Sequence, residues 1–378
     1  MARHKENGQH SRRQMTTTAP SNVSVTIQKA NHLLQQGQLQ QAINVCRQSL
    51  KKIPEEPQLL NMLGILYAQL DKPEAAEKYL KRAIKYAPDE ATYHYNLGKI
   101  LSQHNKSDEA LDSYRAALAI NPNIAEAHIN IGNILKLKKQ FSDAINSYQQ
   151  ALRCNPDLTM AHYNLGTILS GLNQQQEAIQ CHQQAIRCNP GLAEAHYNLS
   201  IIYTGLNQLA TAGDYCRKAI QLKPDYALAY NNLGTILSKQ GDSQEAIHYH
   251  QRAIELEPES ACYYNNLGKT YMELGDFTQA RACFQQAIAR NPSFGIAHYH
   301  LGLLTKHKPE DPAIPTIQAL LNQAEVSLDD KLYLEFALGK ACDDAGKFDA
   351  AYTYFQQGNK GKWAQVNYDS SHYIAFKD

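Results

Sequence analysis

Small and apolar side chains recur along this chain with a period of 34 residues. The stretch Ala-His-Tyr-Asn-Leu-Gly at residues 161–166 returns almost unchanged at 195–200, and a close variant precedes it at 127–132. Shorter Asn-Leu-Gly matches occur at 96–98, 232–234 and 266–268. A fixed period of this size predicts an array of repeated supersecondary units, each of which buries its apolar face against its neighbours.

We number the positions within each unit from 1 to 34. A degenerate first unit covers about Val23 to Glu56, and the second unit begins at Pro57. The later units begin near Ala91, Ala125, Thr159, Ala193, Ala227 and Ala261. A proline at position 32, such as Pro122, ends the last helix of a unit because its ring cannot continue the helix.

Each unit has the pattern of two helices. Apolar or small residues at positions 3, 4, 7, 8 and 11 share one face of the first helix, and positions 2, 6, 9 and 13 lie opposite. Asn173, Asn207, Gly241 and Gly275 at position 15 predict a tight turn. The second helix has Ala at positions 20 and 27 and a larger side chain at position 24. The pattern predicts an all-α fold of stacked antiparallel helix pairs.

Glycine recurs at position 8, inside the first helix. A glycine in a helix interior costs about 1 kcal/mol relative to alanine, so a repeated glycine needs an offset. We expect a close helix contact there, opposite the small alanines at positions 20 and 27. The glycines predicted to make this structural contact are Gly64, Gly98, Gly132, Gly166, Gly234 and Gly268.

This combination of Leu-Gly at positions 7–8, Ala at 20 and 27, an aromatic residue at 24 and Pro at 32 resembles the tetratricopeptide repeat. The resemblance covers roughly residues 23–305, about eight full units and the first helix of a ninth. It implies a right-handed superhelical solenoid, in which the first helices line a concave groove that binds peptides or proteins.

The two ends of the chain depart from the period. Residues 1–22 are polar and predicted to be a disordered tail, and residues 306–331 to be a linker and an extra helix that ends before a cap at Ser327. Residues 332–378 are predicted to be a divergent final repeat, with Trp363 in a segment that covers the last helix pair.

The C-terminal stretch has a second resemblance. Residues 336–341 (Phe-Ala-Leu-Gly-Lys-Ala), Asp343-Asp344 and residues 357–359 (Gln-Gly-Asn) are similar to the junction of bacterial proteins that join tetratricopeptide repeats to a sulfotransferase domain. The phosphosulfate-binding loop of such a domain is not found in this sequence. The resemblance therefore implies shared ancestry of the array and not sulfotransferase activity.

Asparagine occupies position 6 of six successive units. Asparagine is a mediocre helix former, and its amide can both donate and accept, so a row of amides can hold the main chain of an extended peptide. The row resembles the groove of O-linked N-acetylglucosamine transferase; family consensus is the alternative explanation. The predicted peptide-binding ladder is Asn96, Asn130, Asn164, Asn198, Asn232 and Asn266.

Histidines and cysteines recur without the geometry of a metal site. Equivalent residues on successive units lie about one helix-packing distance apart, which is too far to share a metal ion. We therefore expect packing histidines at position 4, reduced cysteines, and no metal or cofactor. The histidines are His94, His128, His162, His196 and His298.

The charge balance and the apolar pattern predict neither a nucleic acid nor a membrane as a partner. The chain has 37 Lys and Arg against 36 Asp and Glu, so no net field favours nucleic acid, and no apolar run is long enough for a membrane span. No catalytic motif is present. We predict a non-enzymatic, cytoplasmic scaffold that binds a protein or peptide ligand. The alternative is the substrate-recognition region of a sulfotransferase or glycosyltransferase whose catalytic domain lies elsewhere; self-association is a third hypothesis.

Overall fold

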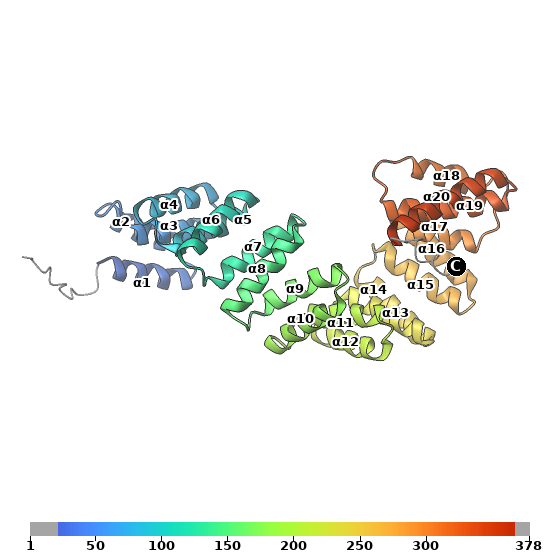
Figure 1. Ribbon diagram of the computed structural model, residues 1–378, viewed down its shortest axis with the longest axis horizontal. Helices are drawn as coiled ribbons and strands as arrows, with labels where there is room; N and C mark the ends of the chain where they lie inside the picture. The colour runs from blue at the N-terminus through green and yellow to red at the C-terminus, as the bar shows by residue number, and fades with distance from the viewer. Residues whose placement is uncertain (1–21, 367–378) are drawn as a thin grey trace, which may run out of the picture. The chain divides into compact units, whose positions relative to one another are not determined.

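The computed structural model describes residues 22–366, and every regular element in this range is an α-helix. The predicted tail and the aromatic residues Tyr368, Tyr373 and Phe376 lie outside the described residues. The helices form two compact units, residues 1–168 and 169–378. Within each unit, helix pairs follow one another in chain order (Figure 1).

The N-terminal unit consists of four helix pairs and most of a ninth helix. Its helices are α1 (Asn22–Gln35), α2 (Leu39–Leu50), α3 (Pro57–Gln69), α4 (Pro73–Tyr86), α5 (Ala91–Gln103), α6 (Ser107–Ile120), α7 (Ala125–Leu137), α8 (Phe141–Cys154) and α9 (Thr159–Gly171). In this unit α1, α3, α5 and α7 each pack on the even-numbered helix that follows, and α3, α5 and α7 also pack on one another in sequence.

The C-terminal unit continues the same pairing and then departs from it. Its helices are α10 (Gln175–Cys188), α11 (Ala193–Gly205), α12 (Leu209–Leu222), α13 (Ala227–Gln240), α14 (Ser243–Leu256), α15 (Ala261–Glu273), α16 (Phe277–Arg290), α17 (Gly295–Leu303), α18 (Ala313–Leu321), α19 (Leu328–Asp344) and α20 (Phe348–Val366).

The second helices bury the residues that the repeat pattern singled out. The alanines at positions 20 and 27 are fully buried, from Ala110 and Ala117 to Ala280 and Ala287. Position 24 is buried as well, whether the residue is aromatic, histidine or cysteine. These residues are Tyr114, Tyr148, His182, Cys216, His250 and Phe284. The core of each pair is therefore built from one large side chain between two small ones.

The glycine at position 8 faces that large side chain. A Cβ on Gly98 would lie 2.8 Å from Cδ1 of Tyr114, and a Cβ on Gly268 would lie 2.7 Å from Cε1 of Phe284. These distances are shorter than van der Waals contact. The sequence-based expectation placed the alanines of positions 20 and 27 opposite the glycine; the structure places the ring at position 24 there, because the ring fills the space that a Cβ would need.

The turns within the pairs have the expected left-handed backbone. Asn173 and Asn207 have φ values of 61° and 57°, and Gly241 and Gly275 have 93° and 81°. Lys139 adopts φ 60° at the same position although it is neither glycine nor asparagine. The left-handed conformation at position 15 is thus a property of the repeat backbone and does not require one residue type.

The first helices bury a wider face than the pattern predicted. Position 10, which the prediction left out of the core, is buried in six successive units: Ile100, Ile134, Ile168, Ile202, Ile236 and Thr270. The wider face arises because a first helix packs against its own second helix and also against the first helix of the next pair, as α11 does against α12 and α13.

The repeat pairing changes after α17. Instead of packing on the helix that follows it, α17 packs on α19, and α18 packs on α19 through Ile314, Ile317 and Leu320. Ser327 caps α19 by accepting a hydrogen bond from the backbone N–H of Asp330, at 3.0 Å. The final helix pair begins at Leu328, not near Leu332.

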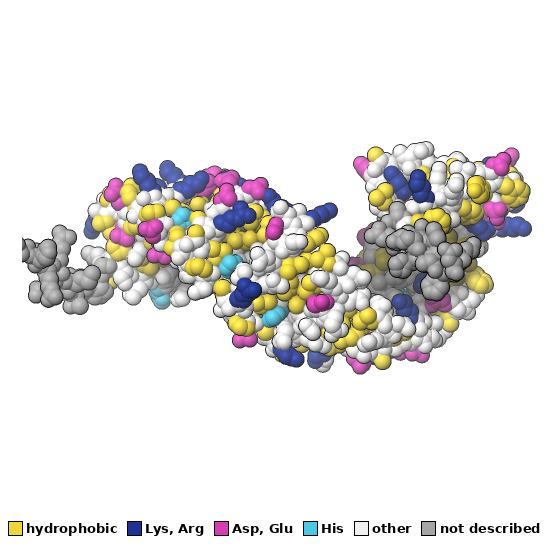
Figure 2. Space-filling model, in the orientation of Figure 1, with side chains coloured by type: hydrophobic (Ala, Val, Ile, Leu, Met, Phe, Trp, Pro, Cys, Tyr) yellow, Lys and Arg dark blue, Asp and Glu magenta, His cyan; other side chains and the backbone are white. Residues whose placement is uncertain are grey.

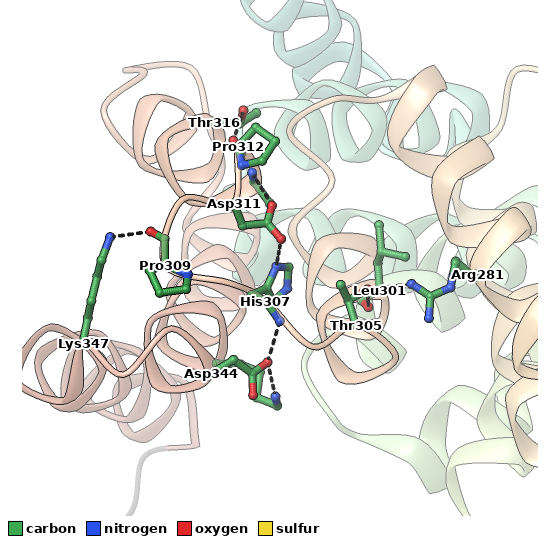
Figure 3. A network of polar contacts seen from close by, with 12 residues as sticks. Arg281, Leu301, Thr305, His307, Pro309, Asp311, Pro312, Thr316, Asp344 and Lys347 are labelled. Carbon is green, nitrogen blue, oxygen red and sulfur yellow. Dashed lines mark hydrogen bonds and ion pairs between the residues drawn. The ribbon is translucent and has the colours of Figure 1, made fainter.

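A polar network holds the connection between α17 and α18 against the neighbouring helices (Figure 3). The buried His307 lies between two carboxylates: its Nδ1 is 2.9 Å from Asp311, and its backbone N–H donates to Asp344. Arg281 of α16 bonds to Thr305 and to the carbonyl of Leu304. These bonds fix the segment that lets α19 take the place of a regular second helix.

Candidate functional site: the first-helix face

In each unit, we call the surface formed by positions 2, 6, 9 and 13 of the first helices the first-helix face. Position 6 is the innermost part of it. In the N-terminal unit, Asn96 donates to Asn61 at 2.8 Å, which joins α5 to α3, and Asn164 donates to Asn133 at 3.1 Å, which joins α9 to α7. The asparagines thus lie between successive first helices.

Asn164 is the most enclosed of these side chains in the N-terminal unit. It is 5% exposed, and its Oδ1 accepts a hydrogen bond of 2.8 Å from Lys136. Burial lowers the pKa of Lys136. Asn133, the acceptor for Asn164, also accepts from the hydroxyl of Tyr148 at 2.7 Å. The amide therefore belongs to a network that ties three helices together.

The C-terminal unit repeats the arrangement with different partners. Asn232 donates to the hydroxyl of Ser200 at 2.8 Å, and Asn266 donates to Asn231 at 3.1 Å. The last first helix has a histidine at position 6, and Nδ1 of His300 lies 2.9 Å from Oδ1 of an asparagine on α15. A bond to the preceding first helix is thus shared by Asn96, Asn164, Asn232, Asn266 and His300.

The exposure of the ladder differs from the prediction. The helical projection placed position 6 opposite the core, whereas Asn96, Asn130, Asn198, Asn232 and Asn266 are half-buried and Asn164 is buried. The reason is that the preceding first helix packs beside these asparagines, as α3 does beside Asn96 and α7 beside Asn164. A role of these residues in peptide binding stays a prediction. In such a role, the same side-chain amide would contact the ligand and a neighbouring residue of the protein.

We expect Asn164→Ala to destabilise the protein by about 1–3 kcal/mol, because Lys136 loses the acceptor of its hydrogen bond and Asn133 keeps only the bond from Tyr148. Urea denaturation of the variant checks this. The matched control is Thr167→Ala, one turn further along α9 on an exposed residue, which should change the free energy of unfolding by less than about 0.5 kcal/mol. Equal stability of Asn164→Ala and wild type would contradict the structural role.

The first-helix face of the N-terminal unit contains a hollow of ≈ 330 Å³ between α3 and α5. The ladder residue Asn96 is part of its lining, together with the exposed polar side chains of Gln69, Lys99 and Gln103. Ile65 and Ile100 supply apolar surface beside them. The hollow therefore combines amide groups, one cation and aliphatic contact area.

The rest of the first-helix face varies from repeat to repeat. Position 2 carries Met160 in one unit and Leu228 in the other, which are 49% and 44% exposed. Position 9 carries the exposed Lys99 and Lys269, and also Ile201, which is 44% exposed. On the side of the N-terminal unit that Figure 2 shows, basic and acidic side chains are interspersed. The side chains at positions 2 and 9 therefore differ in polarity and charge from repeat to repeat, whereas the helical backbone that carries them is the same.

The histidines at position 4 pack in the fold. Nε2 of His94, His128 and His162 lies 2.9–3.0 Å from the carbonyl of the proline at position 32 of the preceding unit, to which it donates. His196 and His298 make the same contact with Pro190 and Pro292. Each histidine thus joins the start of a first helix to the loop before it.

Neither a cluster of metal ligands nor a disulfide is present in the part of the chain that the structure describes. Residues 22–366 contain no group of three or more His, Cys, Asp or Glu side chains arranged to hold a metal ion. All eight cysteines are free. None of the described helices has both the length and the apolar character required to cross a bilayer.

Known proteins resemble the chain in fold. Among solved structures, YrrB, "a TPR protein with an unusual peptide-binding site", is 24% identical with a TM-score of 0.44 over 50% of this chain and 96% of its own. MamA from Desulfovibrio magneticus RS-1 is 24% identical with a TM-score of 0.43 over 45% and 96%. PilF of Pseudomonas aeruginosa is 20% identical with a TM-score of 0.50 over 57% and 97%. No curated protein matches the sequence.

Family models match most of the repeat array. Models described as tetratricopeptide repeat match residues 27–79, 61–125, 161–191, 193–226, 227–260 and 261–294, and a TPR repeat model matches 132–172. The matches extend from α1 to α16, and those at 193–226, 227–260 and 261–294 each cover one helix pair. The chain therefore belongs to the tetratricopeptide repeat family.

Proposed function

We propose that this protein is a non-enzymatic scaffold that binds an extended peptide or protein segment on its first-helix face. The observation that carries the proposal is the hollow between α3 and α5, where Asn96 meets Gln69, Lys99 and Gln103. Amide side chains can donate to peptide carbonyls and accept from peptide N–H groups, so they suit a ligand whose main chain is exposed.

The ladder residue in this hollow has donor and acceptor capacity beyond its bond within the protein. Asn96 gives one amide N–H to Asn61. An asparagine side chain has two N–H donors and a carbonyl oxygen with two lone pairs, so a ligand can bond to it while the bond to Asn61 persists. The exposed Gln69 and Gln103 add two further amides. The ladder then has both roles, joining first helices and contacting the ligand at its outer edge.

The variable residues of the face supply selectivity in this proposal. Met160 in the N-terminal unit, and Ile201 and Leu228 in the C-terminal unit, are exposed apolar side chains, and they suit contact with side chains of a segment bound on their own unit. The competing hypothesis, a substrate-recognition region of a sulfotransferase or glycosyltransferase, uses the same surface. No feature of the described residues favours it.

The test is a selection of peptides that bind the full-length protein, followed by measurement of their affinity for the double variant Lys99→Ala, Gln103→Ala. Both residues are exposed, so the variant should fold normally. Loss of two polar contacts is expected to weaken binding about tenfold, which corresponds to about 1.4 kcal/mol.

The matched control is Arg115→Ala on the second helix α6, where the side chain is 63% exposed. This variant should bind the selected peptides as wild type does. Peptides that bind equally well to wild type and to the double variant would show that the hollow is not the binding site and would refute the proposal.

A further inference from the structure

A second hollow opens on the other side of the helix pairs, between the second helices α2 and α4. Its volume is ≈ 600 Å³, within the range of sites that hold a small ligand or a short peptide segment. Arg47 and Lys51 line it from α2 and the turn after it, and Arg82 lines it from α4. We call this the basic hollow; its lining includes three cations and no carboxylate.

One of the three cations is fixed in place. Arg82 donates from Nη2 to the carbonyl of Pro54 at 3.0 Å, and its guanidinium lies 5.9 Å from the ring centre of Tyr79. Tyr79 in turn stacks on Tyr67, with ring centres 5.3 Å apart and an angle of 2° between the rings. The guanidinium has five N–H donors, and the bond to Pro54 uses one of them. The others are available without reorganisation of the side chain.

The remaining lining suits a peptide. Leu50, Pro54 and Tyr79 give the hollow an apolar floor, and the amides of Asn44 and Gln48 lie beside the cations. Apolar surface, side-chain amides and positive charge together match a segment that alternates acidic and apolar side chains. An arginine can bind a carboxylate with two parallel hydrogen bonds.

The three cations are a property of this pair of helices and not of the repeat. Arg47 and Lys51 stand at positions 25 and 29, and Arg82 stands at position 26 of the next unit. Between α6 and α8 the same three positions carry Arg115, Ala119 and Gln150, a single cation. The basic hollow is therefore a local specialisation at the N-terminal end of the array.

We infer that the basic hollow is a second binding site, separate from the first-helix face, for an acidic peptide segment of a partner protein. A nucleic acid or an anionic membrane is less favoured because Glu55 and Glu56 lie directly beyond Pro54, where they line the neighbouring depression together with Lys52. A long polyanion would meet these two carboxylates, whereas a short acidic segment fits within the hollow.

The test measures binding of a fluorescein-labelled hexaglutamate peptide to the full-length protein by fluorescence anisotropy. Hexaglutamate should bind and labelled hexaglutamine should not, and higher salt should weaken the binding because it screens exposed charges. The double charge reversal Arg47→Glu, Lys51→Glu should reduce the affinity at least about tenfold. Both residues are exposed, so folding should be retained, which circular dichroism verifies.

Two matched variants make the result specific. Arg115→Glu, at the equivalent position of α6, and the first-helix variant Lys99→Ala, Gln103→Ala should both leave hexaglutamate binding unchanged. The second variant separates this inference from the proposed function. Equal loss of affinity in Arg115→Glu, no loss in the double reversal, or tighter binding of a DNA duplex or of phosphatidylserine vesicles at the basic hollow would overturn the inference.

Discussion

Replacing Gly295 by alanine is expected to destabilise the C-terminal unit by about 3 kcal/mol, the upper end of what overpacking costs. A Cβ at this residue would lie 2.2 Å from the carbonyl oxygen of Asp330 and 3.0 Å from its Cα. Both atoms belong to the backbone of α19, so no side-chain rotation can relieve the clash. The first turn of α17 would have to move away from α19.

That movement would also break a polar contact. The backbone N–H of Gly295 donates to Oδ1 of Asp330 at 2.9 Å, which satisfies a donor at the N-terminus of α17. Asp330 thus takes part in the start of both helices, since its own N–H donates to Ser327. The substitution is expected to loosen the docking of α17 on α19 and with it the final helix pair.

Urea denaturation and hydrogen exchange of α17 and α19 measure this effect. The matched control is Gly302→Ala on the same helix, where the nearest atom to a new Cβ is Nε2 of His307 at 4.0 Å. There alanine meets no clash and should stabilise the helix by up to about 1 kcal/mol. A Gly295→Ala protein as stable as wild type would show that α17 and α19 do not pack as described.

Gly295 also shows what sequence could and could not predict. The units that begin at Ala91, Ala125, Ala193, Ala227 and Ala261 have alanine at position 1, so a glycine there departs from the repeat. The departure marks the place where α19 packs instead of a regular second helix. The sequence thus shows that position 1 is unusual in this unit. It does not show that Asp330 approaches Gly295, because Asp330 lies 35 residues away and the periodic pattern describes only contacts between neighbouring repeats.

The ladder illustrates a second limit of sequence-based prediction. Helix pairs, turns and the buried alanines follow from local periodicity, because each is set within one unit. The exposure of Asn164 depends on the helix that packs beside it, and a projection of a single helix contains no information on that neighbour. The burial of position 10 was not predicted for the same reason. The basic hollow, in contrast, depends on cations of two adjacent repeats, which only a comparison of equivalent positions brings together.

Acid should destabilise the C-terminal unit more than the N-terminal one, because its second helices bury histidine. Position 24 is Leu80, Tyr114 and Tyr148 in the N-terminal unit, whereas the other unit has His182 and His250, which are 0% and 1% exposed. Burial lowers the pKa of each of these two histidines from 6.5 to about 4. The folded chain therefore keeps both neutral at a pH where the unfolded chain is protonated.

The consequence for stability follows from the difference in bound protons. Between pH 6.5 and 4 the unfolded chain binds a proton at His250 that the folded chain does not, so the free energy of unfolding falls as the pH falls through this window. The contribution of such a group, complete below pH 4, is about 3 kcal/mol. Above pH 6.5 the histidine is neutral in both states and contributes no pH dependence.

His250→Phe is expected to remove this contribution, so that the loss of stability between pH 7 and pH 4 becomes smaller by about 3 kcal/mol. Phenylalanine fits the site because Phe284 occupies the equivalent position of the next pair beneath Gly268. Asn231 loses a partner, as its Oδ1 is 3.0 Å from Nδ1 of the histidine, but the same oxygen still accepts from Asn266.

Urea denaturation at several pH values, followed by circular dichroism, measures the slope. The control is His248→Gln on the exposed side of the same helix, which should leave the pH dependence as in wild type. A His250→Phe protein that loses as much stability on acidification as wild type would place the acid sensitivity in other groups. The expected result would show that the histidine at position 24 makes the free energy of unfolding of the C-terminal unit fall more steeply at acidic pH.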